Sequence, residues 1–297
     1  MIKKLELDGF ELAYTSEGEG SDVLLLHGFP SNLFFWNDIK KELIKNFRVT
    51  VVEQRGYPFS EIQNSKFSDY NIENLSIDIE KLIINLNLSE KLIIVGHDWG
   101  SIVAWAVASR GNVNISKLVS ICGGTEFPSS DVYQKLSFNK GAHYITSFQQ
   151  PEYSNNILKQ NLDLFFRSAY RMTPKINGIN IDLSLENLFN SYNDVSKVHN
   201  VDFKSLVNHF KEGLDKPISW YRNIDYNIEL SSKWRKKIDT DVTFLFGEND
   251  AAVKLNKKML ERLYASGNNI EVKEISNADH WLPLTHKESV ISEIFNT

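Results

Sequence analysis

Residues 91–101 of the chain, Lys-Leu-Ile-Ile-Val-Gly-His-Asp-Trp-Gly-Ser, contain the feature from which the fold and the chemistry are inferred. The apolar run 92–95 is rich in β-branched residues and too short for a buried helix, so it predicts a buried parallel strand. Residues 102–110 predict a helix, and the turn between strand and helix has the pattern Gly-x-Asp-x-Gly. A strand, turn and helix of this kind form an elbow in which two small residues let the chain present the central side chain. That side chain is Asp98, and a carboxylate nucleophile forms an ester with an electrophilic carbon.

The alternative interpretation of this stretch is an ordinary surface turn, because Gly-x-Asp-x-Gly is a weak pattern by itself. The elements on either side favour the elbow. Apolar runs and helical periodicities alternate along the chain, as they do in α/β folds with a mainly parallel sheet. The predicted strands are 2–7, 10–15, 22–26, 48–52, 115–121, 242–246 and 270–275, and the predicted helices are 31–45, 71–87, 252–264 and 288–295.

The alternation of strands and helices stops after Gly124 and resumes near residue 235. The residues between show short helical patterns, aromatic side chains and Asn-rich loops, with no convincing buried strand. We expect such an insertion to form a lid over the carboxyl ends of the strands, where α/β sheets place their sites. The sequence therefore predicts an α/β core domain made of residues 1–125 and 235–297, and a mainly helical cap domain made of residues 126–234.

The composition excludes several classes of protein. With 297 residues and a net charge of −5, the chain can bury a large core and gives no sign of binding nucleic acid or an acidic membrane surface. Cys122 is the only cysteine, so an intrachain disulfide is excluded and a reducing compartment is favoured; it follows an apolar run and is expected to be buried and inert. Residues 1–8 lack the apolar stretch of a signal peptide, and no apolar run could span a bilayer. We expect a cytoplasmic protein, either a monomer or a homodimer.

Two further polar residues follow predicted strands near the end of the chain. Asp250 comes just after the strand 242–246, and His280 comes after the strand 270–275. The chain order nucleophile, acid, histidine is the one found in elbow-type hydrolytic folds. We expect His280 to be the general base that activates water, and Asp250 to orient its imidazole. Taken alone, each residue has an ordinary explanation. His280 could be a surface histidine, and Asp250 could be the N-cap of a helix that begins at residues 251–253.

Other groups complete this predicted site. Backbone N–H groups of Phe29 and Trp99 are expected to form the oxyanion hole, because Trp99 follows the nucleophile and Phe29 lies in the loop after the third strand. Glu126, at the end of the strand that precedes the insertion, is a second candidate for the acid that orients His280.

Five motifs together resemble the epoxide hydrolase branch of the α/β-hydrolase family. They are Leu-His-Gly-Phe-Pro (26–30), Gln-Arg-Gly-Tyr (54–57), Gly-His-Asp-Trp-Gly-Ser (96–101), Gly-Glu-Asn-Asp (247–250) and Asp-His-Trp (279–281). The resemblance covers nearly the whole chain. It implies a mostly parallel eight-stranded sheet with helices on both faces, an inserted helical cap, and no metal or organic cofactor.

The resemblance reaches into the cap and implies two ring-opening tyrosines. Ile-Ser-Trp-Tyr-Arg-Asn (218–223) is similar to the segment that carries one of them, which corresponds to Tyr221, and residues 144–151 are similar to the segment of the other, which corresponds to Tyr144. Two phenols can bind the epoxide oxygen and donate a proton as the ring opens. The implied reaction forms a hydroxyalkyl ester on Asp98, which water activated by His280 then hydrolyses to a vicinal diol. Without the resemblance, the two tyrosines are equally well explained as packing residues.

The implied partners are a small apolar epoxide and water. The residues expected to line the substrate pocket are Phe29, Pro30, Trp36, Trp99, Phe148 and Trp281. Aromatic enrichment at residues 34–36, 148 and 165–166 suggests an apolar pocket, although a cap core explains part of it. Glu53 and Pro58 depart from the family, which more often has Asp and Gly there; we expect an altered loop shape with unchanged chemistry.

Three other functions remain possible on the sequence. Haloalkane dehalogenases share the elbow His-Asp-Trp-Gly, but they need a second halide donor where this chain has Phe29. Haloacid dehalogenases that act on fluoroacetate usually carry Arg after the nucleophile, where this chain has Trp99. A ligand-binding protein on an inactive hydrolase scaffold is the alternative from another class, and the intact set of Asp98, Asp250 and His280 argues against it.

Overall fold

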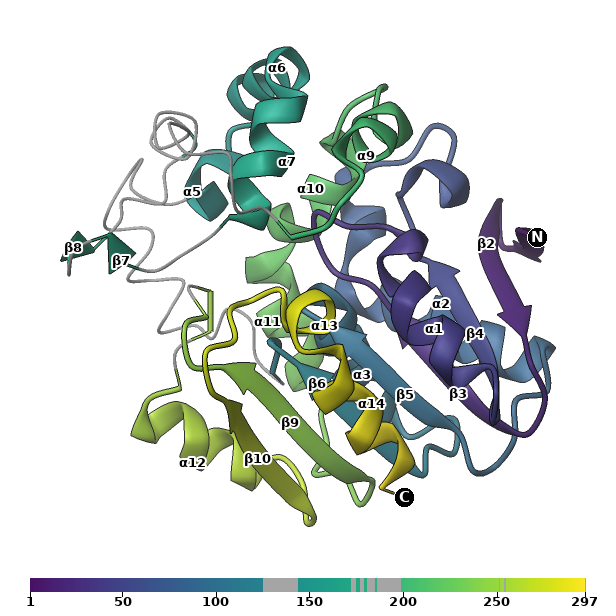
Figure 1. The fold of residues 1–297 in the computed structure, drawn as a ribbon. Coiled ribbons are helices and arrows are strands. Elements are labelled where there is room, and N and C mark those ends of the chain that lie inside the picture. Colours follow the sequence, from purple (N-terminus) through teal and green to yellow (C-terminus); the bar gives the residue numbers. More distant parts are fainter. Residues whose placement is uncertain are drawn as a thin grey trace.

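The computed structural model describes residues 1–124, 144–171, 175–176, 179–180, 185, 199–250, 252–253 and 255–296. Their central feature is an eight-stranded sheet of order β1-β2-β4-β3-β5-β6-β9-β10 (Figure 1). Strand β2 is antiparallel to both neighbours, and every other neighbouring pair is parallel. The strands are β1 (Lys3–Leu7), β2 (Phe10–Glu17), β3 (Ser21–Leu26), β4 (Phe47–Glu53), β5 (Ile93–His97), β6 (Lys117–Ile121), β9 (Asp241–Gly247) and β10 (Ile270–Ile275). The predicted mostly parallel, eight-stranded sheet is confirmed.

The central strands are buried on both faces, which explains their unbroken apolar sequences. All residues of β5 and β6 are buried, and so are the last five of β3. Strand β10 lies at the edge and has no fully buried residue, so charged side chains such as Glu271 and Lys273 alternate along it.

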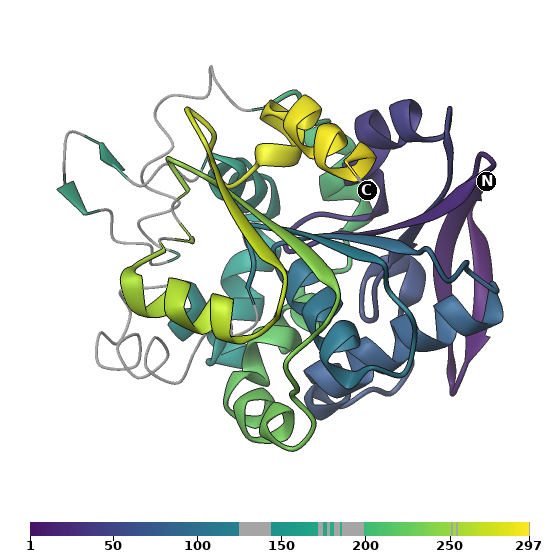
Figure 2. The same cartoon turned by 90° about the horizontal axis from the view of Figure 1, so that it is seen from below.

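Helices cover both faces of the sheet (Figure 2). Helices α1 (Asn37–Leu43) and α14 (Lys287–Phe295) pack together on one face, with the short α13 (Leu282–Thr285) beside them. Helices α2 (Ile72–Asn85), α3 (Trp99–Arg110) and α12 (Lys257–Ala265) lie on the other face. Short 3₁₀ helices occur at Leu33–Trp36, Pro58–Ser60 and Phe67–Tyr70.

Two of the predicted helices begin differently in the structure. The expected helix 31–45 is a 3₁₀ turn followed by α1. The expected helix 252–264 begins only at Lys257, because the carboxylate of Asp250 accepts the N–H groups of Ala252 and Val253 and holds them in a turn. Asn256 then caps α12 through the N–H of Met259.

A second layer follows β6 in the chain and lies beyond the carboxyl ends of the strands (Figure 1). Its described helices are α5 (Tyr144–Phe148), α6 (Pro151–Gln160), α7 (Leu162–Tyr170), α9 (Phe203–His209), α10 (Asp215–Arg222) and α11 (Ile224–Ser232). It also contains the two-residue strands β7 (Lys175–Ile176) and β8 (Ile179–Asn180), which pair in an antiparallel manner. We call residues 126–234 the proposed cap.

Polar contacts fix the proposed cap to the sheet layer. The indole N–H of Trp220 donates to the carbonyl of Arg55 at 3.1 Å. His209 Nε2 lies 2.9 Å from the buried carboxylate of Glu53, which also accepts the N–H of Phe59. Glu53, for which we expected an effect on loop shape alone, therefore also links the two layers. Among the described residues, no helix is both long enough and apolar enough to cross a bilayer.

Candidate active site

The elbow at Asp98 has a strained backbone. Strand β5 ends at His97 and α3 begins at Trp99, so Asp98 alone makes the turn, with φ 53° and ψ −120°. A positive φ is unfavourable for a residue other than glycine and is commonly found at functional sites. The turn also requires Gly100, because a Cβ there would lie 2.3 Å from the carbonyl oxygen of Leu26. The sequence pattern thus has a direct steric reason.

The carboxylate of Asp98 faces two backbone amides. Its Oδ1 accepts the N–H of Phe29 at 2.8 Å, and the N–H of Trp99 also donates to the carboxylate. Gly28 lets the loop after β3 come this close, since a Cβ at that position would lie 2.5 Å from the Cβ of Asp98. The two backbone N–H groups predicted for the oxyanion hole, those of Phe29 and Trp99, therefore both donate to the Asp98 carboxylate.

His280 lies between two carboxylates. Its Nδ1 is 3.1 Å from Asp250 Oδ2 and 3.2 Å from Asp250 Oδ1, while its Nε2 is 3.7 Å from Asp98 Oδ2. The Asp250 contact is a hydrogen bond, and the Asp98 contact is too long to be one. All three side chains are buried. The structure thus brings the predicted nucleophile, base and orienting acid together, whereas the other candidate acid, Glu126, lies outside the described residues.

The charges of these groups shift their pKa values. Burial acts to lower the pKa of His280, but the carboxylates of Asp250 and Asp98 outweigh burial and raise it to about 9. Burial acts to raise the pKa of Asp250, but His280 outweighs it, so this pKa lies below its ordinary value. For Asp98 burial prevails, and its pKa is raised despite His280 and the two amides. The resting site therefore holds an imidazolium between carboxylates.

The two tyrosines named from the sequence lie side by side above Asp98. Tyr144 begins α5 and Tyr221 lies in α10, with their ring centroids 5.9 Å apart. The pKa of each phenol is raised by burial, and the negative charge of Asp98 raises both further. Both phenols therefore keep their protons, and the two are hydrogen-bonded to one another.

Comparison with known proteins agrees with this geometry. A family model described as alpha/beta hydrolase fold matches residues 23–170. The chain is 26% identical over 294 residues to "Epoxide hydrolase 3" of Mus musculus, covering 97% of this chain and 74% of that protein. It is 26% identical over 288 residues to "Epoxide hydrolase 4" of Homo sapiens, covering 94% and 73%. The chain belongs to the α/β-hydrolase family, and these two relatives, which it matches along nearly its whole length, are epoxide hydrolases.

Solved structures support the fold of this family member. Epoxide hydrolase A from Mycobacterium thermoresistibile has a TM-score of 0.85 at 20% identity, covering 100% of this chain and 97% of that one. An epoxide hydrolase from Vigna radiata has a TM-score of 0.82 at 23% identity, covering 99% and 96%. At these identities the likeness concerns the fold.

The hydrolase has a small cavity at Asp98, which we call the Asp98 cavity. Its volume is about 30 Å³, and it is lined by Phe29, Pro30, Asp98, Tyr144, Phe165, Ala169, Tyr221, Ala252, His280 and Trp281. Three of the residues expected in the pocket do not line it: Trp36, Trp99 and Phe148. Trp36 is buried in the 3₁₀ turn against Phe35, and the rings of Trp99 and Phe148 both pack edge to face with the ring of Tyr221.

Two supporting residues of the hydrolase had no role in the sequence interpretation. His97 Nε2 donates to the backbone carbonyl of His280 at 2.8 Å, and burial together with His280 lowers the pKa of His97 to about 3, so it is neutral. Cys122, with φ 52°, places its thiol in a hydrogen bond with the Asp250 carboxylate. Its position after β6 was the only available signal, and nothing in its residue type indicated a bond to Asp250.

One group of possible metal ligands occurs among the described residues. Donor atoms of His97, Cys122 and His280 lie within 4.8 Å of one another. Burial raises the pKa of the Cys122 thiol well above its ordinary value, and the pKa of His280 is about 9. At neutral pH a metal ion would therefore have to displace protons from two of these three donors.

Proposed function

We propose that this hydrolase opens epoxides to vicinal diols through a covalent ester on Asp98. The observation that carries the proposal is a cavity lined by the carboxylate of Asp98 and by the phenols of Tyr144 and Tyr221. A carboxylate can attack an epoxide carbon, and the leaving alkoxide stays attached to the substrate and needs a proton donor. Asp98 provides the nucleophile, and the protonated phenols of Tyr144 and Tyr221 provide the proton donor.

In the first step, Asp98 Oδ2 attacks an epoxide carbon, because Oδ1 is already bonded to the N–H of Phe29. The carbon–oxygen bond of the ring breaks, and its electron pair moves to the oxygen. That oxygen accepts hydrogen bonds from Tyr144 and Tyr221 and takes the proton of one phenol as the ring opens; the proton of the resting His280 imidazolium replaces it, which leaves His280 neutral. The product is a hydroxyalkyl ester of Asp98.

In the second step, water attacks the ester carbonyl. His280 Nε2 takes the proton of this water, and Asp250 orients the imidazole and stabilises the imidazolium. The oxyanion is stabilised by the amides of Phe29 and Trp99, which already donate to the Asp98 carboxylate. The bond between the carbonyl carbon and the alkyl oxygen then breaks, the diol oxygen takes the second proton of the water, and the diol leaves with Asp98 regenerated as a carboxylate. Loss of the Asp98 charge in the ester removes one cause of the high pKa of His280, which favours the neutral base.

Dehalogenation with the same nucleophile is less well supported. A halide released beside Asp98 would need donors such as the indole N–H of Trp99. That indole does not line the Asp98 cavity, and the rings of Tyr221 and Trp220 pack against it edge to face. A cytoplasmic location, a monomeric or homodimeric state and the boundaries of the proposed cap remain predictions from the sequence.

The experiment that tests the proposal is the intact mass of the His280→Gln variant. It is incubated separately with styrene oxide, butylene oxide and a bromoalkane. Because the variant lacks the base for the second step, we expect an adduct equal to the mass of the whole epoxide. The matched control is Asp98→Asn, which should form no adduct. A bare alkyl adduct from the bromoalkane, with none from either epoxide, would replace the proposal with a dehalogenase.

A further inference from the structure

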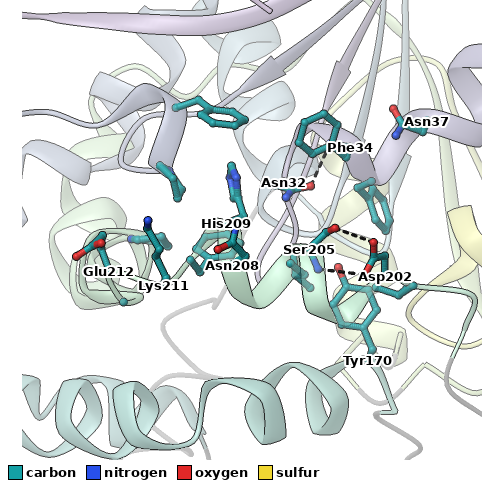
Figure 3. A pocket seen from close by; sticks show the side chains of 18 of the residues that line it. Asn32, Phe34, Asn37, Tyr170, Asp202, Ser205, Asn208, His209, Lys211 and Glu212 are labelled. Atoms are coloured by element: carbon teal, nitrogen blue, oxygen red, sulfur yellow. Dashed lines mark hydrogen bonds between the residues drawn. The ribbon is translucent and has the colours of Figure 1, made fainter.

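A larger hollow lies beside the Asp98 cavity, and we call it the outer groove. It has a volume of about 1160 Å³ and lies between residues 32–61 of the sheet layer and residues 200–217 of the proposed cap (Figure 3). The Asp98 cavity, at about 30 Å³, has room for about two water molecules. Sites for small organic ligands commonly measure about 300 to 1,000 Å³. A substrate with a sizeable substituent therefore needs space beyond the Asp98 cavity.

A layer of aromatic side chains separates the two spaces. Trp281 lines the Asp98 cavity, while Tyr170 and Phe35 line the outer groove. The rings of Tyr170 and Trp281 stack with centroids 3.9 Å apart and an angle of 6° between their planes. The ring of Phe35 packs against Trp281 at 6.0 Å. The cavity and the groove are therefore one layer of side chains apart.

Of the stacked pair, Tyr170 is the less constrained. The indole N–H of Trp281 donates to the carbonyl of Ala169 at 3.1 Å. The phenol of Tyr170 donates to the carbonyl of Pro30 at 3.4 Å, beyond the usual range for an O–H donor. Tyr170 is also the last residue of α7, and the outer groove lies next to it. Rotation of its ring into the groove would join the two spaces.

The chemistry of the outer groove favours a neutral apolar occupant. Its lining includes the apolar side chains of Phe35, Leu206 and Leu284. The charged side chains of the lining include the ion pairs Lys41–Asp38 and Lys216–Glu61 together with Asp202, Lys211 and Glu212, so charges of both signs are present and neither sign alone attracts a charged ligand. Each methylene group removed from water on such a wall contributes roughly a fourfold gain in affinity.

We propose that the outer groove binds the distal part of an epoxide that carries one extended, neutral, apolar substituent, and that Tyr170 separates it from the reacting end. The inference rests on the proposed function, because the epoxide ring lies at Asp98 and only the tail reaches the groove. It makes Tyr170 a residue that determines which length of substrate is accepted.

The first test blocks the outer groove with a large side chain at a position that lines it. Ser205 is exposed, lines the groove and donates to Asp202 at the start of α9 (Figure 3). We expect Ser205→Trp to lower the ratio of kcat/KM for dodecene oxide to kcat/KM for butylene oxide by about tenfold or more, since at least two methylene groups lose their contact. The matched control is Lys204→Trp, at an exposed neighbouring position outside the lining, and it should leave the ratio unchanged. An unchanged ratio in Ser205→Trp would overturn the proposal.

The second test removes the separating ring. Tyr170→Ala should raise the same ratio, because the long substrate no longer has to displace the phenol. Tyr226→Ala is the control, as Tyr226 is a tyrosine of α11 whose side chain is 46% exposed. If Tyr170→Ala lowers both kcat/KM values by the same factor while circular dichroism shows a folded protein, Tyr170 does not determine substrate length.

A binding measurement separates this inference from the proposed function. Decanamide and butanamide are unreactive, and their carbonyl oxygen can accept hydrogen bonds from the two phenols. Isothermal titration should show tighter binding of decanamide than of butanamide to the wild-type protein, and no such gain in Ser205→Trp. If no epoxide is hydrolysed but this pattern holds, the proposed function fails and the groove site stands. Equal affinity of the wild-type protein for both amides would refute the groove site.

Discussion

The buried imidazolium of His280 should make the stability of the folded protein depend on pH in a defined window. The pKa of His280 is about 9 in the folded protein, against 6.5 for an unperturbed histidine. Between these values the folded state holds one proton more than the unfolded state. The stabilisation from this group is therefore complete below pH 6.5, and it is lost as the pH rises through about 9.

The magnitude follows from the same two values. One proton of difference changes the free energy of unfolding by about 1.4 kcal/mol per pH unit, so the loss from pH 6.5 to about 9 is roughly 3 kcal/mol. Two other buried histidines, His27 and His97, do not change the stability between pH 6.5 and about 9. Burial lowers the pKa of His27 to about 4 and that of His97 to about 3, so both affect stability only below pH 6.5.

The assay is urea-induced unfolding, followed by tryptophan fluorescence, of the wild-type protein and of His280→Gln across this pH range. Groups common to both proteins cancel in the difference between the two free energies of unfolding. That difference should shrink by roughly 3 kcal/mol toward high pH. His286→Gln, in the N-cap residue of α14 away from the site, is the control and should run parallel to the wild type. Parallel curves for His280→Gln and the wild type would refute the charge assignment.

Three further predictions concern the two chemical steps. Tyr144→Phe and Tyr221→Phe should each slow ester formation by about a hundredfold, because each removes a proton donor, and single-turnover mass spectrometry with styrene oxide measures this rate directly. Asp250→Asn should still form the ester but hydrolyse it about a thousandfold more slowly, so the adduct should accumulate; a variant that forms no adduct would contradict the assigned role. Cys122→Ala should lower kcat by about tenfold and shift the pH profile of ester hydrolysis, and Cys122→Ser should restore both because a hydroxyl replaces the thiol donor.

The sequence predicted those parts of the fold that depend on local patterns. Strand β5 and helix α3 could be predicted from the sequence because a buried parallel strand is continuously apolar, and because the elbow requires small residues on either side of Asp98. The positions of Asp250 and His280 in the site could be predicted for a related reason. Parallel strands end at the same edge of the sheet, so polar residues just after two such strands come close together.

Contacts between distant segments carried no comparable signal. Glu53 and His209 are 156 residues apart, and neither residue type indicates a bond between the layers. Ala169 and Ala252 line the Asp98 cavity because of where their backbone runs. The helix start at 252 was misplaced because Asp250 binds the following amides with its side chain, a competition that helical periodicity does not reveal.

The strained residues of the site are held by the sheet itself. Asp98 and Cys122 follow the adjacent strands β5 and β6, and both have positive φ angles, 53° and 52°. A conformation of this kind costs about 1 to 3 kcal/mol. Each residue still donates its N–H to the neighbouring strand, Asp98 to Ile121 and Cys122 to Leu245, at 2.9 Å in both cases. The series of backbone hydrogen bonds between neighbouring strands thus continues into each strained residue and fixes the direction of the Asp98 and Cys122 side chains. Because these positions depend on the sheet and the outer groove depends largely on the proposed cap, changes in the cap can alter the accepted substrate while the reacting groups keep their geometry.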